Sequence, residues 1–235
     1  MKDAPGADAE TCWLPKLGHD PHEYEDAAAT HLADWPVRAA VADGATESVF
    51  ARTWAETLVA RYVDGQMPTA STFTEQLPEW QATWQTAIEE QTTALPWYTA
   101  AKVEEGAFAT FLGLTVQRDG RWHALAVGDC NFFHLREDTL LRSWPWASAG
   151  AFTHRPALVP SRSAADPPDL QEAAGTWEAG DTVILATDAS AAWLLATDPT
   201  QATALTADTF APRAAKARRQ GALRNDDATL VLLSL

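Results

Sequence analysis

Cysteine is scarce in this sequence, and long apolar runs are missing. The 235 residues include only two cysteines, Cys12 and Cys130, which are too far apart in sequence to form a metal-binding pair. A domain of this size needs no disulfide for stability, so we expect both thiols to be reduced. No stretch of about 18 apolar residues occurs, which argues against a membrane span. The N-terminus also lacks the basic and apolar regions of a signal peptide, so we expect a cytoplasmic protein without a membrane partner.

Basic residues are also few. The 17 lysines and arginines are outnumbered by 32 aspartates and glutamates, which gives a net charge of -15. Such an acidic protein repels the phosphate backbone of DNA and RNA, which argues against a nucleic-acid partner. The excess charge indicates a solvated acidic surface, a set of carboxylates that converge on a metal, or both.

The composition is that of a globular protein with a buried core. Hydrophobic residues make up 46% of the chain and charged residues 21%, which suits one large domain or two small ones. No internal repeat or linker divides the chain, so we expect a single domain over residues 1–235 and a monomer. Among the 11 tryptophans, Trp54, Trp80, Trp84 and Trp193 fall on apolar faces of predicted helices, which favours core packing.

The first half of the chain predicts a strand hairpin followed by helices. Residues 1–10 are polar and small, and we expect them to be flexible. Apolar runs predict strands at 11–16, 27–32 and 37–42, and apolar residues three and four apart predict helices at 48–63, 73–93 and 97–105. If the second and third strands pair, Glu25, Asp26 and Asp43 approach the same end of a sheet.

The second half begins with β-prone segments. Strands are predicted at 108–116, 122–127, 132–136 and 139–142, and turn signals between them indicate an antiparallel meander. Residues 144–180 are rich in Pro, Ser, Ala and Gly, and we expect a long irregular loop there. Beyond it, the pattern predicts a strand at 183–187, helices at 190–196 and 209–220, and a closing strand at 229–233.

Acidic residues recur where predicted strands end. They are Glu25-Asp26, Asp43, Asp129, Asp188 and Asp226-Asp227. Carboxylates that gather in one place repel one another unless a cation neutralises them. With no His or Cys beside them, an all-oxygen ligand set favours Mg²⁺ or Mn²⁺. A pair of such ions can activate a water and bind a leaving phosphate, which suggests hydrolysis of a phosphate ester.

Six short segments, in order along nearly the whole chain, resemble the metal-dependent serine/threonine protein phosphatases of the PPM, or type 2C, family. They are Glu25-Asp26-Ala27, Ala42-Asp43-Gly44, residues 106–110, Val127-Gly128-Asp129, Ala186-Thr187-Asp188 and residues 226–230. The resemblance implies an α+β fold in which a central β-sandwich of two antiparallel sheets is flanked by helices, in four αββα layers. It also implies a phosphorylated protein as substrate, made by a cognate serine/threonine kinase.

The resemblance further implies a role for each acidic position. Asp43 would bridge two Mn²⁺ or Mg²⁺ ions, one of them also bound by Glu25 and the Gly44 carbonyl. Asp26 would hold a bound water, and Asp188 and Asp226 would bind the other ion. Asp129 would reach toward a third ion. A metal-activated water would then attack phosphorus of phosphoserine or phosphothreonine in line.

The sequence departs from the family pattern at several of these positions. Ala189 follows Asp188 where the family has Gly, and Ala192 stands where it often has a second Asp, so Asp129 lacks a partner and the third ion is in question. The usual Asp-Asn is Asp226-Asp227. Some members also carry an Arg before the first carboxylates that holds phosphate, and here that segment offers only His19 and His22.

These departures leave other functions open. One alternative is a catalytically impaired pseudo-phosphatase that keeps the fold as a binding or regulatory module. Retention of Glu25, Asp43, Asp188 and Asp226 argues against it, since a scaffold gains nothing from carboxylates that repel. A sugar-binding β-sandwich that uses the tryptophans is a further alternative. His19 and His22 could act as general acid or phosphate donor, or be solvated loop residues.

Overall fold

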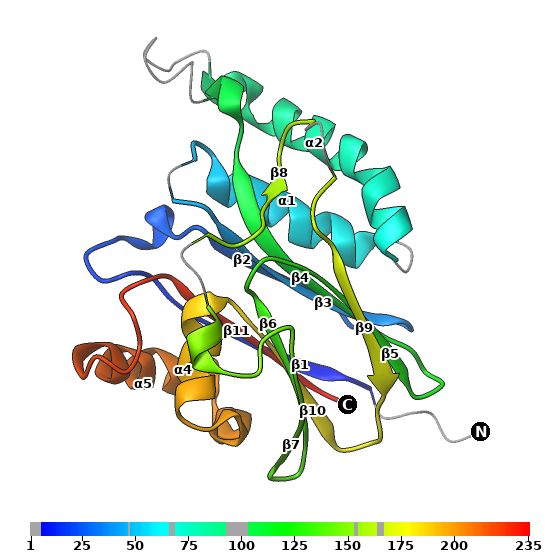
Figure 1. Ribbon diagram of the computed structural model, residues 1–235, viewed down its shortest axis with the longest axis vertical. Coiled ribbons are helices and arrows are strands. Elements are labelled where there is room, and N and C mark those ends of the chain that lie inside the picture. Colours follow the sequence, from blue (N-terminus) through cyan, green and yellow to red (C-terminus); the bar gives the residue numbers. More distant parts are fainter. Residues whose placement is uncertain (1–5, 47, 66–68, 93–102, 153–154, 164–166) are drawn as a thin grey trace.

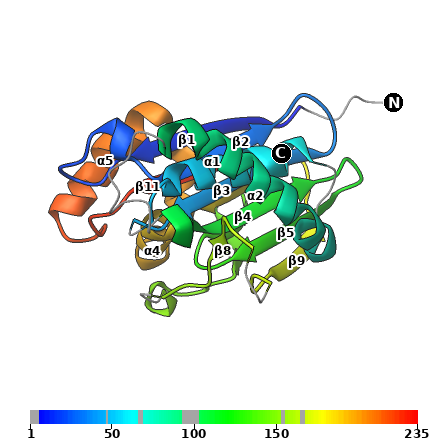
Figure 2. The same ribbon diagram turned by 90° about the horizontal axis from the view of Figure 1, so that it is seen from above.

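A computed structural model describes residues 6–46, 48–65, 69–92, 103–152, 155–163 and 167–235. Two antiparallel sheets lie face to face, and helices cover the outer face of each (Figures 1 and 2). The expected α+β fold with four αββα layers is therefore confirmed. Within the described residues, no helix is both long enough and apolar enough to cross a membrane.

The first sheet has the spatial order β2-β3-β4-β5-β9. Its strands are β2 (Asp26–His31), β3 (Val37–Gly44), β4 (Phe108–Val116), β5 (Arg121–Val127) and β9 (Gln171–Thr176), and the short β8 (Val159–Pro160) also pairs with β4. The hairpin of β2 and β3 forms as expected. It places Asp26 directly opposite Asp43.

The second sheet has the order β1-β11-β10-β6-β7. Its strands are β1 (Asp8–Leu14), β11 (Ala228–Ser234), β10 (Asp181–Ala186), β6 (Asn131–Arg136) and β7 (Thr139–Trp144). The chain crosses from the first sheet to the second between β5 and β6. The four strands expected as one meander thus form two hairpins in different sheets, because Gly128, with φ of +90°, turns the chain away from β5.

Side-chain alternation along β3 explains why its sequence is a continuous apolar run. Val37, Ala39 and Val41 face the other sheet and pack with residues of β10 and β11. Ala40 and Ala42 face the opposite way, toward Trp54 and Leu58 of α1 (Ala51–Asp64). A strand covered on both faces needs apolar residues at every position.

The helices use the apolar stripes that their spacing predicts. Helix α1 buries Trp54, Leu58 and Tyr62 against the first sheet, and α2 (Ala70–Thr92) adds a second aromatic layer. On the second sheet lie α4 (Asp188–Ala196) and α5 (Ala207–Arg219). The described residues also form short 3₁₀ helices at Pro21–Glu23, Ala149–Ala151 and Pro199–Ala204. Trp54, Trp80, Trp84 and Trp193 are all buried, as expected.

Three expectations about irregular segments need correction. The N-terminal strand spans Asp8–Leu14 rather than 11–16, so residues 8–10, expected to be flexible, pair with β11. Residues 144–180 are not one irregular loop, because β8 and β9 both join the first sheet. Most of the helix expected at 97–105 lies outside the described residues. Its last three positions, 103–105, are described and are helical.

Candidate functional site

The acidic positions meet at one end of the sandwich. Asp43 and Gly44 end β3, and Asp129 lies in the turn between β5 and β6. Asp188 begins α4 two positions after the end of β10, and Asp226 lies two positions before the start of β11. Because these strands are antiparallel neighbours or face each other across the core, these ends share one edge of the molecule.

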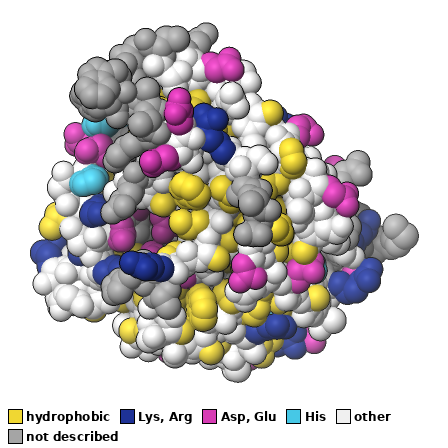
Figure 3. Space-filling view, turned by 45° about the horizontal axis from the view of Figure 1, so that its top comes forward, with side chains coloured by type: hydrophobic (Ala, Val, Ile, Leu, Met, Phe, Trp, Pro, Cys, Tyr) yellow, Lys and Arg dark blue, Asp and Glu magenta, His cyan; other side chains and the backbone are white. Residues whose placement is uncertain are grey.

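A cleft of about 1050 Å³ opens at this edge. Acidic side chains line its floor and basic ones its margin in the space-filling view (Figure 3). Of the expected site residues, five line it, namely Asp43, Gly44, Asp129, Asp188 and Asp226. Glu25 and Asp26 are not cleft-lining residues but adjoin it, since the Gly44 amide donates to the Glu25 carbonyl at 3.3 Å and Asp26 faces Asp43.

Asp26 is a buried carboxylate held by two threonines. Its Oδ2 accepts from Thr187 Oγ1 at 2.8 Å and from Thr229 Oγ1 at 2.5 Å. Tyr24 hydroxyl is hydrogen-bonded to the same Thr229 hydroxyl, and the Thr229 amide donates to Thr187 Oγ1 at 3.0 Å. These bonds fix one oxygen of Asp26 and give Thr187 a defined role.

Asp227 positions the segment that carries Glu25. Its two carboxylate oxygens accept from the backbone amides of Lys16 and Glu25, each at 2.7 Å. Asp227, near the C-terminus, therefore holds in place the N-terminal segment that carries Glu25. Asp226, its neighbour, remains in the cleft.

The carboxylates are unfavourably placed for ionisation. Burial raises the pKa of Asp43 well above its ordinary value, and the charges of Asp26, Asp226 and Asp129 raise it further. Burial likewise raises the pKa of Asp26 to about 7, against hydrogen bonds from Thr229 and Thr187. Asp129 has a pKa near 6, raised by its burial. Burial also raises the pKa of Glu25. When ionised, carboxylates that raise one another's pKa in this way favour the binding of a cation.

The donor set fits a hard divalent cation. Oδ1 of Asp26 and both carboxylate oxygens of Asp129 are buried and have no hydrogen-bond partner among the described residues. Buried unpaired carboxylate oxygens are costly unless a cation or water satisfies them. All the convergent ligand atoms are oxygens, the type that Mg²⁺ and Mn²⁺ prefer.

The departure at Ala189 is accommodated by packing. Its side chain is 1% exposed and lies in the hydrophobic cluster between α4 and the second sheet, with Ala186 and Ala191. The methyl group therefore occupies core space. It is not among the groups that line the cleft.

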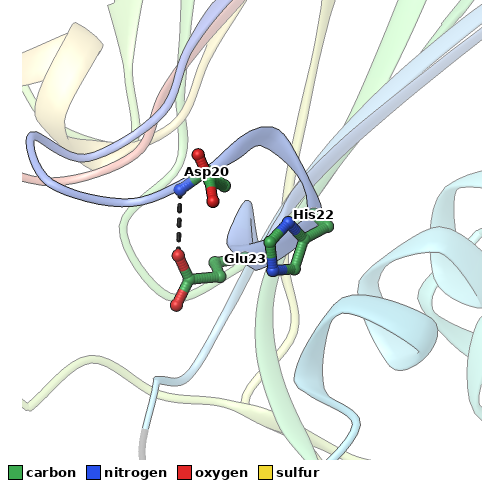
Figure 4. A group of neighbouring side chains, drawn as sticks. All are labelled: Asp20, His22 and Glu23. Carbon is green, nitrogen blue, oxygen red and sulfur yellow. Dashed lines mark hydrogen bonds between the residues drawn. The ribbon is translucent and has the colours of Figure 1, made fainter.

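A second acidic group lies outside the cleft, at the 3₁₀ turn before Glu25. Asp20, His22 and Glu23 approach one another there, and all are exposed (Figure 4). Glu23 accepts the Asp20 amide at 2.9 Å, which is a helix-capping contact. His19 is exposed too, and neither histidine lines the cleft, which favours the solvated-loop interpretation.

Sequence reasoning missed the basic residues of the cleft. Arg155 and Arg224 both line it, and Arg224 forms an ion pair with Asp188. Arg218, from α5, donates to the backbone carbonyls of Pro15 and Asp226. The position of Arg224, two residues before Asp226, was the available signal.

Comparisons with known proteins agree with this geometry. A family model described as protein phosphatase 2C matches residues 20–226. Among curated proteins the search returned no match. Solved structures match at low identity: the S. agalactiae serine/threonine phosphatase has a TM-score of 0.61 at 16% identity, covering 97% of this chain and 100% of that one.

Two further matches are structures of complexes with metal ions. The catalytic domain of the phosphatase PstP in complex with two manganese ions has a TM-score of 0.60 at 17% identity, with 97% of each chain covered. RsbX in complex with magnesium has a TM-score of 0.57 at 17% identity, covering 99% of this chain and 96% of that one. At these identities, the structural matches establish the fold alone.

Proposed function

Because the chain belongs to the protein phosphatase 2C family of metal-dependent serine/threonine phosphatases, we propose that its acidic cleft hydrolyses phosphoserine and phosphothreonine esters at a two-metal centre. The observation that carries the proposal is the convergence of Asp43, Asp129, Asp188 and Asp226 in one cleft, with buried carboxylate oxygens left unpaired. Mn²⁺ or Mg²⁺ fits these ligands, and related structures were solved with those ions.

We assign the ligand roles as follows. Asp43 would be a ligand shared by both ions, and Glu25 with the Gly44 carbonyl would help to hold one of them. Asp188 and Asp226 would hold the other. Asp129 would reach toward a third ion, where Ala192 supplies no second carboxylate.

The bound cations supply Lewis-acid activation of water and neutralise charge on the phosphoryl oxygens. The chain's own residues provide the rest of the chemistry. Asp26 lies beside Asp43 with one oxygen fixed by Thr187 and Thr229, so its other oxygen can orient a water for in-line attack. Thr46, Ser48 and Thr110 line the same cleft and offer hydroxyls to a phosphorylated side chain.

The substrate is a phosphorylated protein, made by a serine/threonine kinase, and the enzyme acts on it as a monomer. The openness of the cleft to the surface suits a phosphorylated side chain carried on a protein (Figure 3).

The test is hydrolysis of para-nitrophenyl phosphate and a phosphothreonine peptide, with Mn²⁺ titrated in and EDTA as control. Wild-type turnover should require metal, and Asp43→Asn should lose at least about a thousandfold in kcat, since it removes the ligand shared by both ions. Asp138→Asn, an exposed acid in the turn between β6 and β7, should behave as wild type.

The same experiment addresses the pseudo-phosphatase alternative, which Ala189 and Ala192 favour. Metal binding without turnover would support a regulatory module. Full activity of Asp43→Asn would reject the assignment of that residue.

A further inference from the structure

Arg224 lines the acidic cleft and contacts its carboxylates. It forms an ion pair with Asp188, and its Nε lies 3.9 Å from Oδ2 of Asp226. Its positive charge also lowers the pKa of Asp129, opposing the effect of burial. One guanidinium therefore interacts with three carboxylates that we assign to metal ions.

The backbone that carries Arg224 is held in place. Arg218 donates from one end of its guanidinium to the Asp226 carbonyl at 2.6 Å and from the other to the Pro15 carbonyl at 2.7 Å. The Asp226 amide donates to the Arg224 carbonyl at 3.1 Å. The side chain itself is 38% exposed, so it can turn while its backbone stays fixed.

The segment before Glu25 cannot supply a phosphate-binding arginine. It contains none, and its histidines, His19 and His22, are exposed and do not line the cleft. Among the described cleft-lining residues, the only bases are Arg155 and Arg224. Both are exposed, but Arg224 pairs with Asp188 and lies near Asp226, the carboxylates at which a phosphoryl group would be bound.

We propose that Arg224 is the phosphate-binding residue of this enzyme and that it alternates between two partners. Without divalent cations it pairs with Asp188. Once cations neutralise Asp188 and Asp226, its planar guanidinium is free to bind two phosphoryl oxygens, a geometry for which arginine is better suited than lysine. This inference rests on the proposed function, because it assumes that cations bind these carboxylates.

Two opposite effects of Arg224→Ala distinguish this role from a structural one. Phosphate binding should weaken by at least about tenfold, because a charge-assisted bidentate contact is lost. Mn²⁺ binding should tighten, because no guanidinium competes for Asp188. Simple damage to the site would weaken both. Arg224→Lys should keep part of the competition with Mn²⁺ but recover little phosphate binding.

The experiment measures two affinities and one rate. Calorimetry gives the affinity of inorganic phosphate for the Mg²⁺-loaded protein, equilibrium dialysis gives that of Mn²⁺ for the metal-free protein, and a phosphothreonine peptide gives kcat and KM. Arg219→Ala, on the exposed end of α5, is the matched control and should leave all of them unchanged.

The outcomes separate this inference from the proposed function. Unchanged phosphate affinity in Arg224→Ala, or weaker Mn²⁺ binding, would overturn the role of Arg224 even if the wild type is active. An inactive wild type would count against the proposed function, while the calorimetric comparison would still decide whether Arg224 binds phosphate. A loss of phosphate affinity in Arg155→Ala alone would assign the role to Arg155 instead.

Discussion

Gly44, at the end of β3, packs closely against the backbone of Glu25 and of Ala51. A Cβ at this position would lie 2.9 Å from the Glu25 carbonyl oxygen and about 3.0 Å from the backbone of Ala51 at the start of α1. Both obstacles are backbone, so the added methyl must displace the strand end that bears the proposed carbonyl ligand. We expect Gly44→Ala to weaken Mn²⁺ binding and lower turnover by about tenfold or more, and to cost about 1–3 kcal/mol of stability.

Metal affinity by equilibrium dialysis and stability by urea unfolding check this prediction. Gly150→Ala is a suitable control, because that glycine is exposed and a Cβ there meets nothing within 4 Å. Wild-type Mn²⁺ affinity in Gly44→Ala would show that the Gly44 carbonyl is not a ligand.

At the same scale, the sequence identified acidic residues better than basic ones. Strand-end carboxylates carry a local signal, since each follows an apolar run and breaks it. Arg224 does not follow an apolar run in this way. Its role comes from its contact with Asp188, which lies 36 positions earlier in the sequence. The same holds for Asp227, whose partners Lys16 and Glu25 lie at the other end of the chain.

Among the elements, β8 forms the link between helix α1 and the cleft. Trp54 Nε1 donates to the Val159 carbonyl at 2.8 Å, and Gln81 Nε2 of α2 donates to the Pro160 carbonyl at 3.0 Å. The two residues of β8 also pair with β4. Just before β8 lie Arg155, Pro156 and Leu158, which line the cleft. Trp54→Phe keeps an aromatic ring but leaves this carbonyl unpaired, at a cost of about 1–3 kcal/mol.

Hydrogen exchange measured by mass spectrometry tests the link. Peptides that cover residues 155–163 should exchange faster in Trp54→Phe, while those from β3 and β10 stay protected. Trp80→Phe is the matched control, since that buried ring packs on Phe73 within α2. Equal exchange in the two variants would mean that the Trp54 hydrogen bond does not hold β8.

A helix or strand could be predicted where its own residues carry a clear apolar pattern. Helices α1 and α2 and the β2–β3 hairpin follow from apolar periodicity. Strand β9 does not, because Gln171–Thr176 is a sheet edge with few β-branched or aromatic residues, and it pairs with β5 some 50 positions earlier. Edge strands of this composition resemble loops until their partner is known.

For the molecule as a whole, two groups of acids give stability opposite dependences on pH. Burial alone would raise the pKa of Asp181, but hydrogen bonds from Arg136, the Glu178 amide and His134 lower it to about 2. Asp181 is ionised more readily when folded, so its contribution is present above its unfolded pKa near 3.8 and is lost as the pH falls toward 2.

Two buried acids at or beside the cleft, Asp26 and Asp129, give stability the opposite dependence on pH. Asp26 and Asp129 have folded pKa values near 7 and 6, above an unfolded value near 3.8, so they bind protons more tightly when folded. Their contribution is present below that value and is lost as the pH rises through 6 and 7. The metal-free protein should therefore be most stable in weak acid, at about pH 4–5.

Divalent cations should remove the alkaline loss and leave the acid loss unchanged, because they bind ionised carboxylates in the cleft and not Asp181. Thermal unfolding across this pH range, in EDTA and in Mg²⁺, measures both. The rise in Tm caused by Mg²⁺ should grow steadily from about pH 5 to about pH 8.

Arg136→Gln should lower stability only on the acid side of the pH profile, because it removes the main donor to Asp181, at 2.7 Å. Asp26→Asn should flatten only the alkaline side in EDTA. If general repulsion from the net charge of -15 caused the alkaline loss of stability, removing one carboxylate would leave that slope nearly unchanged. The Asp26→Asn result therefore shows whether the loss comes from the buried carboxylates or from the surface charge.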